Sequence, residues 1–325
     1  MRRDLARQFL SDMYLARQFE QRAAEEYAQG RIAGFLHLYP GEEAVAVGSL
    51  AAADPGDYVV STYREHVHAL VRGTPPGAVM AELFGRADGC SGGYGGSMHL
   101  FDVERRFLGG YAIVGETFPV AVGAGYWLRL SAAPDAVLCF FGDGAANQGT
   151  FHESLNMAAL WNLPVVFLCE NNHYQIGTEI HRHSAVPHVH KRASGNGVEG
   201  RWVDGMDVVA VHEATREALR HVREGNGPVL LECETYRFRG HSMADPAAYR
   251  SALEENELRA RDPLLTFRRR AEREGWLAAG EMDELAQQAE TEVEEAVRFA
   301  AASPPPEDLY RHVHQAPLNL YGGRP

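Results

Sequence analysis

Hydrophobic side chains recur every three or four residues at the start of the chain. The residues in this series are Leu5, Phe9, Met13, Ala16, Phe19 and Ala23. This spacing is the period of an amphipathic helix, whose apolar positions form one stripe. Gly30 follows as a candidate C-cap, so the pattern predicts an opening helix over residues 1–30.

A different pattern begins near residue 136, where short apolar runs alternate with amphipathic stretches. The runs AVLCFF (136–141), PVVFLCE (164–170) and PVLLECETYRF (228–238) indicate strands, and helices are expected near 148–160 and 207–223. Nearly continuous apolar strands separated by helices are typical of a parallel sheet covered on both faces. The predicted fold class is therefore α/β, with a doubly wound, mostly parallel sheet and helices on both faces.

Further elements are expected around this centre. Residues 40–57 predict a short helix, and residues 57–66 predict a strand that runs into a loop. Residues 85–110 are rich in glycine, so we expect a loop there. Charged, alanine-rich stretches predict a C-terminal extension of two helices over about residues 254–302. Because there is no internal repeat or low-complexity linker, we predict a single domain over residues 1–325.

Composition and charge narrow the classes of partner. The chain has 325 residues, of which 45% are hydrophobic and 23% charged, as is typical of globular proteins. The net charge of -13 leaves no basic patch for a nucleic-acid backbone. No apolar stretch approaches the roughly 20 residues that span a bilayer, the first residues lack the apolar core of a secretory signal, and the four cysteines show no CxxC spacing. We therefore expect a cytoplasmic protein that binds neither nucleic acid nor membranes.

Two short polar motifs follow the first two predicted strands of the alternating region. GDG occupies residues 142–144, NN occupies residues 171–172, and 26 residues separate the two motifs. In a parallel sheet, the loops at the carboxyl ends of the strands open at one edge, where ligands bind. If the strands are neighbours, the Asp143 carboxylate and the Asn172 side-chain carbonyl can bind one hard cation such as magnesium.

The glycines of the first motif point to an anionic ligand for this cation. Gly142 and Gly144 leave room for the backbone to approach anionic oxygens, and the amino end of the next predicted helix adds a positive dipole. A diphosphate bound through magnesium fits this arrangement. The alternative is that GDG is only a turn and NN only a loop, because such residues dominate turns, but the spacing and the strand context favour the ligand site.

Five longer motifs extend the pattern: GDGAANQG, NMAALWNLP, ENNHYQIGT, RWVDGMDV and YRFRGHSMADP. Together they resemble the alpha subunits of thiamine-diphosphate-dependent 2-oxo acid dehydrogenases, and the similarity runs from about residue 5 to about residue 310. The resemblance implies a thiamine-diphosphate-binding fold in which this chain forms the diphosphate-binding half. It also implies thiamine diphosphate and Mg²⁺ as cofactors, and oxidative decarboxylation of a 2-oxo acid, pyruvate first, with acyl transfer to lipoamide.

The resemblance also implies partner chains. Cofactors of this class need a carboxylate beside the aminopyrimidine ring, and the chain has no glutamate in a matching context. A beta subunit is therefore expected to complete the site in a heterotetramer of two alpha and two beta subunits. A lipoyl-bearing acyltransferase is the implied acyl acceptor.

Roles for individual residues follow from the resemblance. The implied magnesium ligands are Asp143, Asn172 and the main-chain carbonyl of Tyr174. Arg64 is expected to bind the distal phosphate with help from Tyr63, since a planar guanidinium can bind two phosphate oxygens at once. The alternative for this arginine is an ion pair with Glu65 or another surface acid.

Two histidines and several small residues complete the implied site. The further cofactor-binding positions are Ala112, Val114, Gly115, Gly142, Gly144 and Ala145, the first three of them beside the aminopyrimidine ring. His241, in RGHSMADP, matches a histidine that binds at the mouth of the site and moves a proton during acyl transfer, and His37 matches a second histidine near the substrate. A histidine titrates near neutrality and so can give and take a proton; a structural hydrogen-bonding role is the alternative for both.

Some positions depart from the family pattern. Tyr94, Glu116 and Gln175 replace residues expected near the cofactor or the substrate channel, so they leave the substrate open. We do not predict phosphorylation of Ser242, because the sequence that follows it differs from the pattern of the phosphorylated relatives.

One loop is unusually rich in histidine. Its four histidines are His181, His183, His188 and His190. A transition-metal site is one interpretation, but no cysteine or clustered carboxylate completes it in the sequence, so a solvated loop is predicted.

Three other functions remain as alternatives. The alpha subunit of an acetoin dehydrogenase and a subunit of a pathway-specific carboligase would use the same cofactor. A non-catalytic scaffold subunit belongs to another class, and the joint presence of Asp143, Asn172, Arg64 and His241 argues against it.

Overall fold

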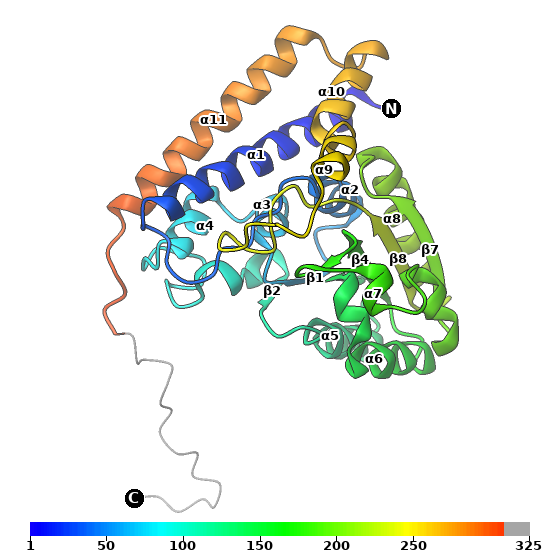
Figure 1. Ribbon diagram of the computed structural model, residues 1–325. Coiled ribbons are helices and arrows are strands. Elements are labelled where there is room, and N and C mark those ends of the chain that lie inside the picture. The colour runs from blue at the N-terminus through cyan, green and yellow to red at the C-terminus, as the bar shows by residue number, and fades with distance from the viewer. Residues whose placement is uncertain (309–325) are drawn as a thin grey trace, which may run out of the picture.

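A six-stranded sheet forms the centre of the computed structural model, which describes residues 1–308. The strands lie in the order β2-β1-β3-β4-β8-β7. Their bounds are β1 (Tyr58–Thr62), β2 (Phe107–Tyr111), β3 (Val137–Gly142), β4 (Val165–Asn171), β7 (Glu199–Asp204) and β8 (Val229–Glu234). All neighbouring pairs run parallel, and helices cover both faces (Figure 1). The predicted doubly wound α/β fold is therefore confirmed.

The alternation of side chains along the strands divides the core into two layers. On β3, Leu138 and Phe140 belong to one buried cluster and Cys139 and Phe141 to the other, as the pleat of a strand requires. The helices that pack on the first layer are α2 (Glu43–Ala52), α3 (His66–Val71), α4 (Pro76–Leu83) and α8 (Val208–Arg223). Those on the second layer are α5 (Thr117–Ser131) and α6 (Gly149–Leu160). Each fully buried leucine or phenylalanine stabilises the fold by roughly 1.5–3 kcal/mol, so these layers hold the strand ends in place.

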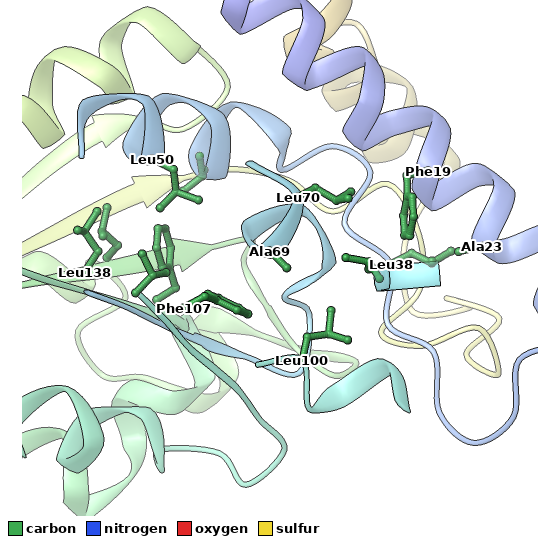
Figure 2. Close-up of a cluster of buried hydrophobic side chains, with 14 of the residues drawn as sticks. Phe19, Ala23, Leu38, Leu50, Ala69, Leu70, Leu100, Phe107 and Leu138 are labelled. Atoms are coloured by element: carbon green, nitrogen blue, oxygen red, sulfur yellow. The ribbon is translucent and has the colours of Figure 1, made fainter. Parts of the chain in front are cut away.

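Four further helices complete the fold, and the first and last of them also add side chains to the first core layer. They are α1 (Arg3–Ala28), α9 (Ala252–Arg259), α10 (Pro263–Arg273) and α11 (Ala279–Ala302). In Figure 1, α1 and α11 run side by side. Figure 2 shows Phe19 and Ala23 of α1 in one buried cluster with Leu70 of α3 and Leu138 of β3. Burial of this apolar stripe explains the spacing that predicts the first helix.

The single-domain organisation stays a prediction, and residues 309–325 of the predicted domain lie outside the described range. Within residues 1–308, no helix is both long and apolar enough to cross a bilayer.

The glycine-rich segment at residues 85–110 differs from the predicted loop, because strand β2 begins inside it. Glycine is required there by close packing. A Cβ on Gly109 would lie 2.2 Å from the ring of Phe101. A Cβ on Gly110 would lie 1.9 Å from Glu65 Oε1. These glycines do not break the strand. They make room for the large side chains that pack against this edge strand.

Other elements also differ from the sequence patterns. Helices α3, α4 and α5 and strand β7 are not predicted, and the C-terminal extension contains three helices, α9, α10 and α11, instead of the predicted two. Strand β8 ends at Glu234 although the apolar run continues to residue 238. Thr235 N still donates to Asn171 O of β4, and the chain then leaves the sheet, so that Phe238 N donates to Pro40 O. Short 3-10 turns lie at Gly96–Met98, Val103–Arg105, Asp143–Asn147 and Val189–Asn196.

The sheet topology brings the GDG and NN motifs together. β3 and β4 are neighbours, and Gly142 pairs with Glu170 at their carboxyl ends. Asp143 starts the turn after β3, and Asn172 directly follows β4. The next elements along the chain are the small strands β5 (Tyr174–Gln175) and β6 (Thr178–Glu179) and helix α7 (Ile180–His183). The predicted cation site requires that these two strands are neighbours, and the structure meets this requirement.

Candidate active site

A cavity of about 270 Å³ lies at the carboxyl edge of the sheet. Its wall comes from the loops that follow β1, β2, β3 and β4 and from the segment after β8. Among its lining residues are all the predicted site residues: His37, Tyr63, Arg64, Ala112, Val114, Gly115, Gly142, Asp143, Gly144, Ala145, Asn172, Tyr174 and His241. The fold thus gathers into one cavity residues that lie as many as 204 positions apart in the sequence, from His37 to His241.

The carboxylate of Asp143 has the surroundings of a cation ligand. Its side chain is 2% exposed, and Oδ2 accepts no hydrogen bond within the described part of the chain. His183 Nε2 lies 3.3 Å from Oδ2, which is ion-pair range, although the contact lacks hydrogen-bond geometry. An unsatisfied buried carboxylate oxygen is costly unless a cation or a donor meets it. The site therefore fits a metal ion at Asp143.

Asn172 is held by hydrogen bonds on both ends of its amide. Nδ2 donates to Glu42 Oε1 at 3.1 Å, and Oδ1 accepts from Tyr174 N at 3.2 Å. The side-chain orientation is therefore defined, and Oδ1 keeps a second lone pair. Carboxylate, amide and main-chain oxygens from Asp143, Asn172 and Tyr174 make an oxygen set that suits a hard cation.

Two buried arginines give the cavity its positive charge. Arg64 donates to Leu38 O at 2.6 Å and to His241 O at 2.8 Å. Its nearest carboxylate is the buried Glu42, at 3.9 Å, so the alternative pairing with Glu65 or a surface acid is wrong. Arg237, which the sequence reasoning missed, lines the same cavity and is 1% exposed. Burial and the charge of Arg237 lower the pKa of Arg64.

This pair of guanidinium groups suits an anion such as a diphosphate, because each can donate two hydrogen bonds in a fixed plane. The only signal for Arg237 in the sequence is its place in YRFRGHSMADP, four residues before His241.

Three aromatic rings meet beside Arg64. The ring centroids of His37 and Tyr63 are 4.5 Å apart, and those of His37 and His241 are 5.0 Å apart. Burial and the charge of Arg64 lower the pKa of His37 to about 2. Burial and the charges of Arg64 and Arg237 lower the pKa of His241 to about 3. Both rings are therefore neutral at pH 7, which differs from the titration near neutrality expected from the sequence.

A buried acidic group lies at the floor of the cavity. Burial raises the pKa of Glu42 to about 7, although Arg64 acts in the opposite direction. Glu170 accepts a hydrogen bond from the Tyr39 hydroxyl, and His68 Nε2 lies 3.2 Å from Glu170 Oε1. The sequence reasoning missed both glutamates, since acids in a helix start and in a strand carry no motif of their own.

The departures from the family pattern lie in different places. Gln175 lines the cavity and covers Gly144, where a Cβ would lie 2.6 Å from Gln175 Cγ. Tyr94 and Glu116 do not line the cavity, although Glu116 lies between the lining residues Gly115 and Thr117. The Tyr94 hydroxyl donates to Asp308 O instead, and Glu116 is an exposed residue at the start of α5.

The chain is similar to known proteins over most of its length. The dehydrogenase E1 component family matches residues 11–308. Pyruvate dehydrogenase E1 component subunit alpha from Porphyra purpurea is 45% identical over 302 residues, covering 91% of this chain and 88% of that protein. The proteins of the same name from Rickettsia felis and Rhizobium meliloti are 42% and 44% identical over 305 residues each. Those matches cover 93% of this chain, and 94% and 88% of the two relatives. The family match spans every segment that lines the cavity.

Proposed function

The chain belongs to the dehydrogenase E1 component family, and on that premise we propose that it is the alpha subunit of a pyruvate dehydrogenase. Its reaction is the oxidative decarboxylation of pyruvate with transfer of the acyl group to lipoamide. The names of the relatives, at 42–45% identity over most of the chain, support this proposal. The observation on which this proposal rests is that one cavity is lined by two buried arginines and by Asp143, whose carboxylate has an oxygen without a hydrogen-bond donor.

We propose thiamine diphosphate and Mg²⁺ as the cofactors of this cavity. The residues that would bind the magnesium ion are Asp143, Asn172 and the main-chain carbonyl of Tyr174. Those that would bind the diphosphate are Tyr63, Arg64, Arg237 and the backbone of Gly142, Gly144 and Ala145. Those that would contact the aminopyrimidine ring are Ala112, Val114 and Gly115. In support, anionic oxygens match the arginines, and the oxygen set matches a hard cation.

Thiamine diphosphate, when bound, supplies a carbon nucleophile and an electron sink for decarboxylation. The chain itself excludes water, orients the cofactor and moves protons. His241 and His37 are the proposed proton carriers, because both imidazoles line the cavity. A bound diphosphate would offset the arginine charges that lower the pKa values of both rings, and so would make them better bases. The main-chain carbonyl of His241 also accepts a hydrogen bond from Arg64 and so helps to hold that side chain in place.

A beta subunit is the proposed partner for the open side of the site, in a heterotetramer with two copies of each chain. Exposed aliphatic residues of the loops that line the cavity support a protein contact there. They are Ile113, Val114 and Ile176. A lipoyl-bearing acyltransferase is the proposed acyl acceptor, and the expected cytoplasmic location stays a prediction.

Calorimetry on the complex with its beta subunit tests the proposal. We expect thiamine diphosphate to bind only in the presence of Mg²⁺. Asp143→Asn should weaken this binding by more than about 100-fold, because even groups that merely orient a metal ligand contribute about 10–100-fold. Asp88→Asn, at an exposed acid, is the matched control. An unchanged cofactor affinity in Asp143→Asn would remove Asp143 from the site, and failure of the wild-type complex to bind the cofactor would favour a scaffold subunit.

Turnover assays separate the remaining alternatives. Pyruvate should be the preferred substrate when pyruvate, acetoin and branched 2-oxo acids are compared on one preparation. Preference for acetoin would indicate an acetoin dehydrogenase. Carbon–carbon bond formation without acylation of lipoamide would indicate a carboligase.

A further inference from the structure

The histidine-rich loop meets a carboxylate that the sequence did not place near it. His188 and His190 lie beside Glu232 of β8, which comes 42 residues after His190. One ligand atom from each of the three side chains lies within 4.8 Å of the other two. The sequence alone showed no carboxylate near these histidines. The sheet supplies one, so the loop has the set of ligands that a metal site requires.

Local backbone geometry explains how the two histidines come to share a side. His188 is extended, with φ -79° and ψ 103°, and directly precedes the 3-10 turn Val189–Asn196. His190 is the second residue of that turn, and the turn brings its ring back to the side of His188. The ring centroids of His188 and His190 are 5.7 Å apart. Val189, between them, is buried in the second core layer, which anchors the loop against the sheet.

The carboxylate of Glu232 is rigidly oriented. Its side chain is 1% exposed, and Oε1 accepts from Asn171 Nδ2 at 2.6 Å. Oε2 accepts from the backbone N of His190 at 2.9 Å and from His190 Nδ1 at 2.5 Å. Metal sites in proteins typically have such hydrogen bonds, which orient the ligand side chain toward the ion. A metal ion at Nδ1 would replace the ring hydrogen bond, with the ring proton then carried by Nε2.

Access also suits a cation. His188 is exposed and His190 is partly exposed, so an ion can enter from solvent. Ligand atoms around tetrahedral zinc lie about 3.4 Å apart, and rotation of the exposed His188 ring closes the remaining gap.

We propose that His188, His190 and Glu232 form a binding site for a divalent transition-metal ion of the zinc type, with a fourth position open to solvent. Two imidazoles and one carboxylate favour zinc and similar late first-row ions, whereas magnesium prefers oxygen ligands alone. The bound ion clamps the histidine-rich loop to β8. None of the three ligands lines the cavity, so this inference is independent of the proposed function.

Zinc titration in excess Mg²⁺ tests the site on the purified, metal-free protein, with its beta subunit where the two purify together. Excess Mg²⁺ fills hard oxygen sites and leaves an imidazole site free. We expect one Zn²⁺ per chain by calorimetry. Binding of Co²⁺ should give visible absorption bands of a tetrahedral nitrogen and oxygen site, without the intense near-ultraviolet bands of cysteine ligation.

Single-residue variants locate the ion. His188→Ala should weaken Zn²⁺ binding by at least about tenfold, and it changes an exposed side chain, so folding is retained. His181→Ala is the matched control, because His181 is an exposed histidine of the same loop outside the cluster. His183→Ala tests a histidine of the same loop whose Nε2 lies 3.3 Å from the Asp143 carboxylate.

The proposal is supported if only His188→Ala weakens Zn²⁺ binding. It is overturned if the wild type binds no Zn²⁺, if His181→Ala weakens binding as much as His188→Ala, or if the loss is confined to His183→Ala. Cysteine-type bands in the Co²⁺ spectrum would also overturn it.

Discussion

Glu82, at the end of α4, organises the glycine-rich loop through a buried carboxylate. The side chain is 0% exposed. Oε2 accepts from Ser91 N and Gly93 N, each at 2.8 Å. Oε1 accepts from Gly95 N at 2.7 Å and from Gly96 N at 3.1 Å. One carboxylate therefore satisfies four backbone N–H groups of a loop that leads into the cavity wall.

Glu82→Gln keeps the shape of the side chain but turns one acceptor into a donor. Two backbone N–H groups then face an NH₂ group, and each buried unsatisfied group costs about 1–3 kcal/mol. The other two hydrogen bonds lose the strengthening by a charged acceptor, about 1 kcal/mol each. After partial relaxation of the loop, we expect the free energy of unfolding to fall by about 3–5 kcal/mol, a large part of the ~5–15 kcal/mol typical of folded proteins.

Urea unfolding followed by tryptophan fluorescence measures this change, because the chain has four tryptophans. Hydrogen exchange of peptides that cover residues 85–96 locates it, since the four N–H groups should lose protection while those of β3 and β4 keep theirs. Glu104→Gln is the matched control, because Glu104 is exposed and lies in the same glycine-rich segment, beyond the four N–H groups that Glu82 binds. A fall of less than about 1 kcal/mol, or unchanged exchange in the loop, would refute the role of Glu82.

Two further predictions concern titratable groups. Burial raises the pKa of Glu65 from 4.5 to about 8. Between these pH values the folded chain therefore keeps a proton on Glu65 that the unfolded chain has lost. The contribution of this group to the free energy of unfolding falls as the pH rises through that range. Glu65→Gln removes the titration, so its free energy of unfolding should decline less steeply over this range, and an unchanged slope would contradict the shift. His241→Ala should lower acylation of lipoamide by about 100-fold or more while decarboxylation into an artificial electron acceptor persists; equal loss in both assays would speak against a role in acyl transfer.

Much of the fold was predictable because burial leaves a local trace in the sequence. The apolar stripe of α1 and the continuous apolar runs of β3 and β4 follow from which faces are buried. The helices α2, α6 and α8 lie where the patterns place them. β2 was missed because its glycines, which resemble a loop in sequence, make room for the Phe101 ring and the Glu65 side chain.

The predicted site residues come together in one cavity because their motifs stand directly after strands of one parallel sheet. Arg237, Glu42 and Glu170 have no comparable signal, and only the chain path brings them to that cavity. The lowered pKa values of His37 and His241 could not be predicted from the sequence either. A free histidine titrates near neutrality, whereas burial beside Arg64 lowers the pKa of His241 to about 3.

The sequence by itself determined the α/β class, the two strand ends that carry Asp143 and Asn172, and the identity of the chemistry-bearing residues, because alternation, turns and motifs depend on neighbours within a few positions. The tertiary structure decided which distant groups touch: Arg64 with the carbonyl of His241, four N–H groups with Glu82, and His190 with Glu232. Those contacts, and the proton affinities they change, depend on burial and on distances across the folded chain, which no local pattern contains.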